Sequence, residues 1–486
     1  MTSQIETNHL FAGSFGKKKR ALFRFLQDEN STEIEFTPKT LEQCISSEPS
    51  RLWLVYSVLT GRLPTSADVS HMKYLCEIGQ TRQAILYAEK HARISSRILR
   101  NSPPVMVVTD SIFVDVHHTS RTLLATGIQK VVRETVQAWV ATGRQVVLAT
   151  WIKSNESYQS LNQAGAINMG VPSSSTSGLV KEEVLLVPWR SKVVLPELGI
   201  EPERTSRLLA LAQFSGNSFY GLGFDCIPVT TAETVAPGMA SAYSNYLSVL
   251  AHAEVVAPIS LASGREFSGW KNMLPSRGIS GPEIVPVVLP TVAPDGPSHD
   301  FVDTSIVPSD SPVVICVGSH EPRKNHLSVL YAAEQLWLQG EDFSLVFIGG
   351  NSWNAREFDE LFERLGHKGR KLFKFSKASD GFVRAMYDRA RLSVFPSLNE
   401  GFGLPLTESL ACGTPCVTSN FGSMAEIAEG GGCITIDPRN VSELAFSMSR
   451  ILNDDALHDQ LCAEAAKRLQ KNWKEYADEL WTAFFG

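Results

Sequence analysis

Short apolar runs and longer amphipathic stretches alternate through the second half of the chain. The runs VVICVG, SLVFIGG, LSVFPS and PCVTS are separated by stretches with apolar residues every three or four positions, such as HLSVLYAAEQLWLQG and REFDELFERLG. Short continuous apolar runs are typical of buried strands, and the wider spacing is typical of amphipathic helices. Regular alternation of the two indicates a parallel sheet covered by helices. The pattern therefore predicts a doubly wound α/β domain over residues 301–470.

The same alternation begins earlier, at residue 104. The β-rich run VMVVTDSIFVDV is followed by the helical pattern TGIQKVVRETVQAWVATG and the strand pattern RQVVLATW. This order predicts a second Rossmann-like domain, over residues 104–300. Within it, residues 154–178 are rich in Ser, Gly and Asn and are expected to form a long loop. The Pro-, Ser- and Asp-rich segment LPTVAPDGPSHDFVDTSIVPSDSP is expected to link the two domains. Two such domains are expected to form a small-molecule cleft between them.

Outside these two domains the pattern is helical. Residues 1–103 contain helix-length stretches interrupted by Gly61, Pro64 and Gly79, so we expect a helical N-terminal extension without strands. The final segment, 471–486, has the apolar spacing of an amphipathic helix. Residues 15–26 (FGKKKRALFRFL) mix basic and apolar side chains. This mixture occurs in a helix on an anionic lipid surface, but it is more often a solvated basic face over a buried apolar side.

Composition and charge bear on whether the protein binds nucleic acid, spans a membrane or is secreted. Hydrophobic residues make up 43% and charged residues 20%, as in an ordinary globular protein, and the formal net charge is -6. A mildly acidic chain has no overall attraction to nucleic acid, so no nucleic-acid partner is expected. The stretch 235–253 is too polar for a membrane span, and the start of the chain lacks a secretory pattern. Because the eight cysteines are scattered without a CxxC pair, we expect reduced thiols and a cytoplasmic location.

The stretch LSVFPSLNEGFGLPLTESLACG places two carboxylates beside the start of an expected helix. Glu400 lies in the preceding loop, and Glu408 follows in the first turns after seven intervening residues. Gly401 and Gly403 allow the backbone to approach a ligand, and free amides at a helix start attract phosphate or sugar oxygens. Two carboxylates so placed can accept hydrogen bonds from hydroxyl groups of one ligand. From spacing alone, an ordinary loop–helix junction with two unrelated glutamates remains the better explanation.

The stretch VVICVGSHEPRKNHLSVL places two cations in a comparable position. Gly318 ends an expected strand, and Arg323 and Lys324 lie in the loop before the next helix. A diphosphate leaving group needs cations to hold its developing charge. Taken alone, this stretch is explained more simply by a solvated Arg–Lys pair. Together with the glutamate pair, it favours a diphosphate site, most strongly at Lys324.

These motifs resemble the donor site of retaining GT-B glycosyltransferases of the family 4 type, within the group 1 glycosyl transferases. NEGFGLPLTESLACGTPCVTS is similar to the family's Glu, seven residues, Glu signature, and EPRKN to its Glu-Pro-Arg-Lys-Asn segment. The resemblance implies a GT-B fold whose last helix crosses back to the first domain. It also implies that Glu400 contacts the hydroxyls of the donor sugar, and that Glu408 binds the nucleotide ribose. The catalytic residues would be Glu400, Lys324 and Arg323, and the amides facing sugar and phosphate would be those of Gly401, Phe402, Gly403 and Leu404.

Two further stretches resemble mannosyltransferase-like members. ATGIQKVVRE is similar to their Thr-Gly-Ile-Gln-Arg-Val loop and helix, which implies that Gly127 brings a helix N-terminus to the cleft opposite the diphosphate. GFDCIPV is similar to their His-Asp-Leu-Ile-Pro, with Asp225 at the aspartate and Phe224 where His is common. Asp225 is therefore an acceptor-side candidate. His118, at the end of the first strand of its domain, is another, although a histidine at a strand end is more often structural.

The resemblance implies a transferase that moves mannose from GDP-mannose, with retention, onto a saccharide or lipid-linked saccharide in surface polysaccharide synthesis. No Asp-x-Asp motif occurs, so neither a metal nor a cofactor beyond the nucleotide-sugar co-substrate is expected. The alternatives are a UDP-sugar-dependent transferase, a sugar-nucleotide epimerase on the same fold, and a non-catalytic scaffold in a polysaccharide assembly complex. The basic segment 15–26 would give peripheral contact with the inner face of the membrane.

Overall fold

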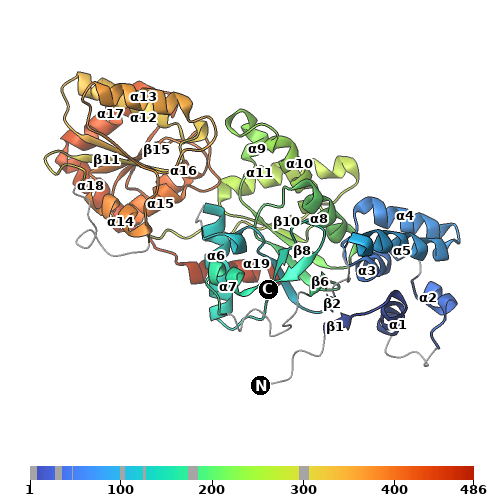
Figure 1. Cartoon of the computed structure of the whole chain (residues 1–486). Coiled ribbons are helices and arrows are strands. Elements are labelled where there is room, and N and C mark those ends of the chain that lie inside the picture. The colour runs from blue at the N-terminus through green and yellow to red at the C-terminus, as the bar shows by residue number, and fades with distance from the viewer. Residues whose placement is uncertain are drawn as a thin grey trace.

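Two β-sheets organise the chain into two lobes (Figure 1). The structure, a computed structural model, describes residues 8–27, 35–45, 48–98, 104–123, 127–172, 184–294 and 306–486. We call the ten-stranded sheet with its helices, within residues 8–294, the first lobe. The six-stranded sheet with its helices, within residues 306–466, is the second lobe.

The sheet of the first lobe has the order β1-β2-β6-β5-β4-β3-β7-β8-β9-β10, with β1 and β5 antiparallel to their neighbours and the other pairs parallel. Its strands are β1 (Asn8–Phe11), β2 (Val105–Val108), β3 (Ile112–Asp115), β4 (Val147–Trp151), β5 (Tyr158–Ser160), β6 (Leu185–Pro188), β7 (Lys192–Leu195), β8 (Ser218–Gly223), β9 (Val255–Pro258) and β10 (Glu283–Ile284).

Two elements of this lobe differ from the expectation. The N-terminal region, expected to be wholly helical, contributes β1, which pairs with β2. The expected loop at 154–178 contains β5 and the helix α7 (Gln163–Met169), although residues 173–178 lie outside the described part of the chain. Both strands are too short to show an alternation in sequence, and β5 is fixed by tertiary packing. Its Tyr158 is fully buried, with its ring 4.2 Å from that of Trp151.

Helices cover the first sheet and extend one side of it (Figure 1). The N-terminal helices pack on one another and on α8, the side of the lobe away from the second lobe. The helices are α1 (Phe15–Leu26), α2 (Pro38–Ile45), α3 (Pro49–Thr60), α4 (Ser66–Glu77), α5 (Thr81–Ile98), α6 (Gly127–Ala141), α7, α8 (Pro202–Phe214), α9 (Ile227–Thr230), α10 (Met239–Leu250) and α11 (Leu261–Lys271).

The second lobe has the predicted doubly wound architecture. Its sheet is entirely parallel, in the order β13-β12-β11-β14-β15-β16. The strands are β11 (Val313–Val317), β12 (Ser344–Ile348), β13 (Leu372–Phe375), β14 (Leu392–Phe395), β15 (Cys416–Ser419) and β16 (Cys433–Ile436). The helices are α12 (His326–Leu338), α13 (Arg356–His367), α14 (Asp380–Arg389), α15 (Leu404–Ala411), α16 (Gly422–Ala428), α17 (Val441–Asn453) and α18 (Asp455–Ala466).

The last helix, α19 (Trp473–Phe485), returns to the first lobe and lies beside α6 (Figure 1). Tyr476, Leu480 and Phe484 on its apolar side are buried. The indole of Trp139 in α6 donates a hydrogen bond to the backbone oxygen of Ala477 at 2.8 Å. Residues 467–472 therefore carry the chain from the second lobe back to the first.

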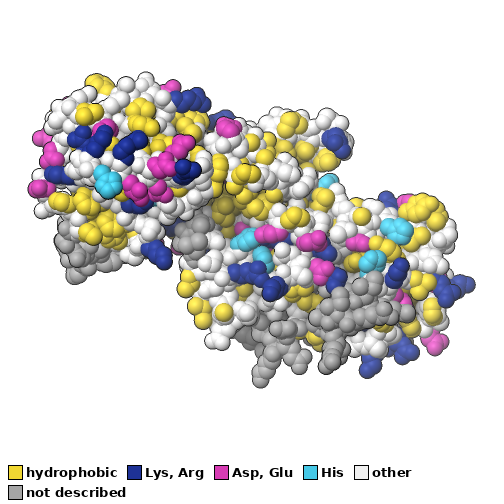
Figure 2. Space-filling model, turned by 45° about the horizontal axis from the view of Figure 1, so that its top comes forward, with side chains coloured by type: hydrophobic (Ala, Val, Ile, Leu, Met, Phe, Trp, Pro, Cys, Tyr) yellow, Lys and Arg dark blue, Asp and Glu magenta, His cyan; other side chains and the backbone are white. Residues whose placement is uncertain are grey.

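The basic segment 15–26 forms α1, whose apolar side packs into the protein. Leu22, Phe23 and Leu26 are buried, and even Lys18 is buried, with its ammonium donating to the backbone oxygen of Val58. This packing supports the interpretation as a basic face over a buried apolar side. Among the described residues, no helix combines the length and apolar character that a bilayer crossing requires. On the face seen in Figure 2, basic and acidic side chains are interspersed.

Candidate functional site

The candidate site lies where the strand order of the second lobe reverses. The chain leaves β11 toward β12 and β13, then returns to form β14 on the other side of β11. In such sheets, ligands bind outside the carboxyl ends of the strands at this reversal. The two predicted motifs follow these strands, one after β11 and one after β14. Sheet topology therefore brings together two motifs that lie about 80 positions apart in sequence.

An open cleft of about 520 Å³ lies between the lobes at this point. All but one of the site residues expected from the sequence line it. They are Gly127, Asp225, Gly318, Arg323, Lys324, Glu400, Gly401, Phe402, Gly403, Leu404 and Glu408. The first two come from the first lobe and the others from the second. The structure thus assembles the predicted residues at one site, and their individual roles stay predictions.

Two helix N-termini face one another in the cleft. α15 begins at Leu404 after Gly403, whose φ of 115° is in the range that favours glycine, and Pro405 occupies its first turn. α6 begins at Gly127, and a Cβ added to Gly127 would touch the Leu404 side chain at 3.4 Å. The positive end of each helix dipole favours an anion at this place. The cleft is therefore polarised for a phosphate group from both lobes.

Glu400 is held between the two predicted cations. Its carboxylate oxygens lie 2.6 Å from a guanidinium nitrogen of Arg323 and 2.5 Å from the ammonium of Lys324. Arg323 also contacts the carboxylate of Glu321 at 2.7 Å, and its guanidinium donates to the backbone oxygen of Asn399. Burial by itself would raise the pKa of Glu400, but the adjacent cations lower it to about 2. The carboxylate is therefore ionised throughout the physiological range.

Glu408 forms an ion pair across the cleft. Its carboxylate lies 3.0 Å from the ammonium of Lys130, which belongs to α6 of the first lobe. Both side chains are largely buried. Lys130 was missed as a site residue, although it stands within the quoted stretch ATGIQKVVRE, one turn after Gly127. The helical period places it on the cleft side with Gly127, which was the available signal.

The lobes also touch at the loop that carries Glu400. The hydroxyls of Ser260 and Ser263 in the first lobe donate to the backbone oxygen of Gly401 at 2.6 and 2.9 Å. A Cβ added to Gly401 would lie 2.5 Å from the backbone oxygen of Phe224. Glu426 of α16 accepts hydrogen bonds from the first amides of α11, which satisfies the start of that helix. Gly401 therefore permits a close approach of the lobes as well as of a ligand.

Asp225 lies in the cleft on the first lobe, opposite this loop. Burial raises the pKa of its carboxyl to about 6, although Arg323 acts in the opposite direction. One of its oxygens accepts a hydrogen bond from the amide of Ile227, and the hydroxyl of Tyr243 donates to its backbone oxygen. The carboxyl is thus positioned from its own lobe and faces the cations of the other.

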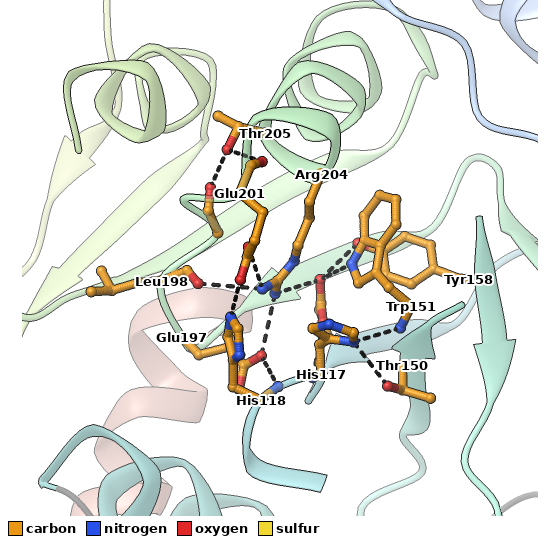
Figure 3. Close-up of polar contacts among 12 residues, drawn as sticks. His117, His118, Thr150, Trp151, Tyr158, Glu197, Leu198, Glu201, Arg204 and Thr205 are labelled. Atoms are coloured by element: carbon orange, nitrogen blue, oxygen red, sulfur yellow. Dashed lines mark hydrogen bonds and ion pairs between the residues drawn. The ribbon is translucent and has the colours of Figure 1, made fainter. Parts of the chain in front are cut away.

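His118 is the expected site residue that does not line the cleft. Its ring lies 2.7 Å from Glu201, and its amide donates to Glu197 (Figure 3). The two glutamates belong to a buried network around Arg204, whose guanidinium contacts Asp115 at 3.1 Å and Glu197 at 3.2 Å. Local charge pairing therefore holds His118 in the first lobe. The expectation that it would reach the cleft is not met.

Other lining residues were not anticipated. Asp380 and Val383, on consecutive turns of α14, also line the cleft, and Ile259 and Leu289 add apolar surface from the first lobe. Within the described ranges, no three His, Cys, Asp or Glu side chains are grouped to hold a metal ion. The arrangement offers carboxylates for hydroxyl groups, and cations and amides for a diphosphate.

Comparisons with known proteins agree with this geometry. Residues 301–476 match the family model described as Glycosyl transferases group 1. Over 340 residues the chain is 27% identical to the serotype-specific mannosyltransferase WbdA of Escherichia coli, covering 66% of this chain and 40% of that protein. It is 29% identical over 170 residues to O-antigen chain mannosyltransferase B of Escherichia coli, covering 35% of this chain and 44% of that protein. The chain thus spans less than half the length of these relatives.

Solved structures share the two-lobed architecture. The sucrose-phosphate synthase of Thermosynechococcus elongatus superposes with a TM-score of 0.54 at 17% identity, covering 77% of this chain and 98% of that one. An Escherichia coli trehalose-6-phosphate protein bound with UDP-2-fluoro glucose superposes with a TM-score of 0.55 at 9% identity, over 77% and 99% of the chains. At such identities the likeness establishes the fold alone. The chain therefore has the GT-B fold, and its second lobe matches the family model described as Glycosyl transferases group 1.

Proposed function

We propose that this chain is a retaining glycosyltransferase that moves mannose from GDP-mannose onto a saccharide or lipid-linked saccharide during surface polysaccharide synthesis. One observation carries the proposal: two carboxylates, the three cations paired with them and two helix N-termini meet in one cleft between GT-B lobes. Relatives named as mannosyltransferases, one of them for the O-antigen chain, support the choice of sugar and pathway.

In the proposed complex the nucleotide sugar lies along the second lobe. The ribose hydroxyls donate to Glu408, and the hydroxyls of the transferred sugar donate to Glu400. The diphosphate lies against the amides at the start of α15, where Lys324 and Arg323 supply positive charge. The acceptor approaches from the first lobe, past Asp225.

The proposed chemistry is a front-face displacement. The acceptor oxygen forms a bond to the anomeric carbon on the side from which the diphosphate departs, as the bond from that carbon to the diphosphate oxygen breaks. The acceptor proton passes to the departing diphosphate oxygen, so the products are the glycoside and the nucleoside diphosphate. Lys324 and Arg323 hold the charge that develops on the leaving group. The configuration at the anomeric carbon is retained.

Asp380 supports guanosine over uridine as the nucleoside. Guanine presents two adjacent N–H donors, which match the two oxygens of one carboxylate. Uracil presents one N–H between two carbonyl oxygens, and a carboxylate would face repulsion from those oxygens. Asp380 lies on α14, two helical turns from Tyr387, whose hydroxyl donates to the backbone oxygen of Pro405 at the start of α15. Seven residues of helix span about 10 Å, a suitable distance from a ribose to the far edge of its base.

The first test is thermal stabilisation by GDP, UDP, ADP and their sugars, because a ligand that binds only the folded protein raises its melting temperature. Stabilisation by GDP and GDP-mannose alone is the expected result. Stabilisation by UDP compounds alone would replace the donor and leave the reaction class in place. If no nucleotide stabilises the protein, the transferase proposal fails and the scaffold alternative takes its place.

Substitutions then test the site itself. Lys324→Ala should lower transfer about 100-fold or more, the scale seen when a group that stabilises transition-state charge is removed. Glu408→Ala should lower transfer through weaker donor binding, because the ribose hydroxyls lose a charged acceptor worth about 1.5–3 kcal/mol. Their melting temperatures should stay close to that of the unsubstituted protein. Lys368→Gln is the matched control, since Lys368 pairs with Glu334 on the surface of the same lobe. Full activity in both site variants would contradict the assignment.

A further inference from the structure

The ion pair between Lys130 and Glu408 joins the lobes at the position proposed for the donor ribose. Lys130 comes from the second turn of α6, and Glu408 from the second turn of α15. The ammonium and the carboxylate lie 3.0 Å apart and are largely buried in the cleft wall. Ribose hydroxyls that bind this carboxylate either share it with the ammonium or displace the ammonium.

The cations that line the cleft are all engaged by the carboxylates that are proposed to bind the donor. Lys130, Arg323 and Lys324 are the lining lysine and arginine side chains among the described residues. Arg323 and Lys324 contact Glu400, and Lys130 contacts Glu408. A donor whose hydroxyls bind both carboxylates therefore competes with these cations for the carboxylate oxygens. The diphosphate of the same donor offers the cations a second anion.

We propose that Lys130 is a donor-binding residue supplied by the first lobe. It contacts Glu408 while the cleft is empty and turns to the diphosphate when the ribose takes Glu408. The inference rests on the proposed function, because it requires a nucleoside diphosphate in this cleft. The inference goes beyond the proposed function because it gives the first lobe a direct part in donor binding. The diphosphate would then hold the two lobes together.

The position and chemistry of Lys130 fit this exchange. The residue lies one turn after Gly127, and the start of α6 faces the start of α15 across the cleft. A phosphate on the amides of α15 therefore lies between the two helix ends. Lysine carries its charge on a flexible four-carbon stem, so the ammonium can change partners without a backbone movement. As a point charge with three N–H donors, the ammonium can donate to a phosphate oxygen from many directions.

The test compares a nucleoside diphosphate with its nucleoside. Isothermal titration of GDP and guanosine, with UDP and uridine in parallel, is carried out on the unsubstituted chain, Lys130→Gln and the surface control Lys368→Gln. Lys130→Gln should weaken binding of the diphosphate about tenfold or more, the scale of a charge-assisted hydrogen bond. Binding of the nucleoside should be unchanged or tighter, because Lys130 no longer competes for Glu408. Lys368→Gln should match the unsubstituted chain with both ligands.

Two other results would overturn the inference while leaving the proposed function intact. Equal weakening of diphosphate and nucleoside would mean that Lys130 only orients Glu408. Tightening of both would mean that Lys130 only competes for Glu408. If the unsubstituted chain binds no nucleoside diphosphate, the proposed function and the inference fail together.

A double-mutant cycle with Glu408→Gln independently distinguishes direct contact of Lys130 with the diphosphate from an effect of Lys130 that acts only through Glu408. The loss of GDP affinity caused by Lys130→Gln should persist in the Glu408→Gln background if Lys130 contacts the diphosphate. It should vanish there if Lys130 acts only through Glu408, which would overturn the inference. Melting curves of each variant establish that the affinity changes come from a folded protein.

Discussion

Gly401 is the residue at which the loop of the second lobe comes closest to the first lobe, and it allows a quantitative test of how the cleft is built. A Cβ added there would lie 2.5 Å from the backbone oxygen of Phe224 and 3.0 Å from a carboxylate oxygen of Asp225. Gly401 is not among the residues with positive φ, so alanine causes no left-handed strain of its own. Gly401→Ala should therefore act by pushing the lobes apart.

The magnitude follows from the contacts that would be lost. Restoring an ordinary carbon–oxygen contact of about 3.3 Å requires a local opening of roughly 0.8 Å. Overpacking of this kind costs about 1–3 kcal/mol. The opening also lengthens the hydrogen bonds from Ser260 and Ser263 to the backbone oxygen of Gly401, each contributing about 1 kcal/mol. A total of about 3–5 kcal/mol against the closed arrangement, if both hydrogen bonds are lost, corresponds to a loss of roughly 100-fold or more in donor binding or kcat/KM.

The assay measures nucleotide affinity, kcat/KM for transfer and the melting temperature of Gly401→Ala. Gly366→Ala is the matched control: Gly366 lies in α13, and a Cβ there meets no atom within 4 Å. Because alanine favours a helix, the control should be slightly more stable and fully active. If Gly401→Ala bound the donor and transferred the sugar as well as the unsubstituted chain, the closed contact between the lobes would not be required for function.

Two further predictions concern buried charge. Arg204→Met should lower the unfolding free energy of the first lobe by about 3–5 kcal/mol, because it leaves the buried carboxylates of Asp115 and Glu197 without their cation. Urea denaturation followed by tryptophan fluorescence measures this, and a change below about 1 kcal/mol would refute the reasoning. The raised pKa of Asp225, about 6 against an ordinary 3.8, means that its contribution to stability is present below about pH 4 and is lost as the pH rises through 6. Asp225→Asn should remove this dependence, and identical melting-temperature profiles from pH 4 to 7 in both proteins would refute the assignment.

Much of the second lobe follows from local pattern. The strands around Cys316, Phe347 and Val394 are short apolar runs that the sheet buries, and the amphipathic stretches between them form helices. The loops that carry the two motifs, after β11 and β14, could also be predicted from sequence. In each case an apolar run ends at a glycine or a proline, which marks the end of the strand. The first lobe was harder to predict. Its β5 is three residues long and exists because Tyr158 packs on Trp151 and its hydroxyl donates to Asp115.

The sequence by itself determined the alternation of strands and helices, the loops that carry Glu400, Arg323 and Lys324, and the resemblance that groups them. Only the tertiary structure decided which distant residues meet. Lys130 and Glu408 are separated by 278 positions and pair because α6 and α15 face each other across the cleft. His118 stays in its own lobe because Glu201 is its nearest charged partner there. Backbone periodicity is a local property of the chain, whereas contact across a cleft depends on the order of strands and the packing of two lobes, which no single stretch encodes.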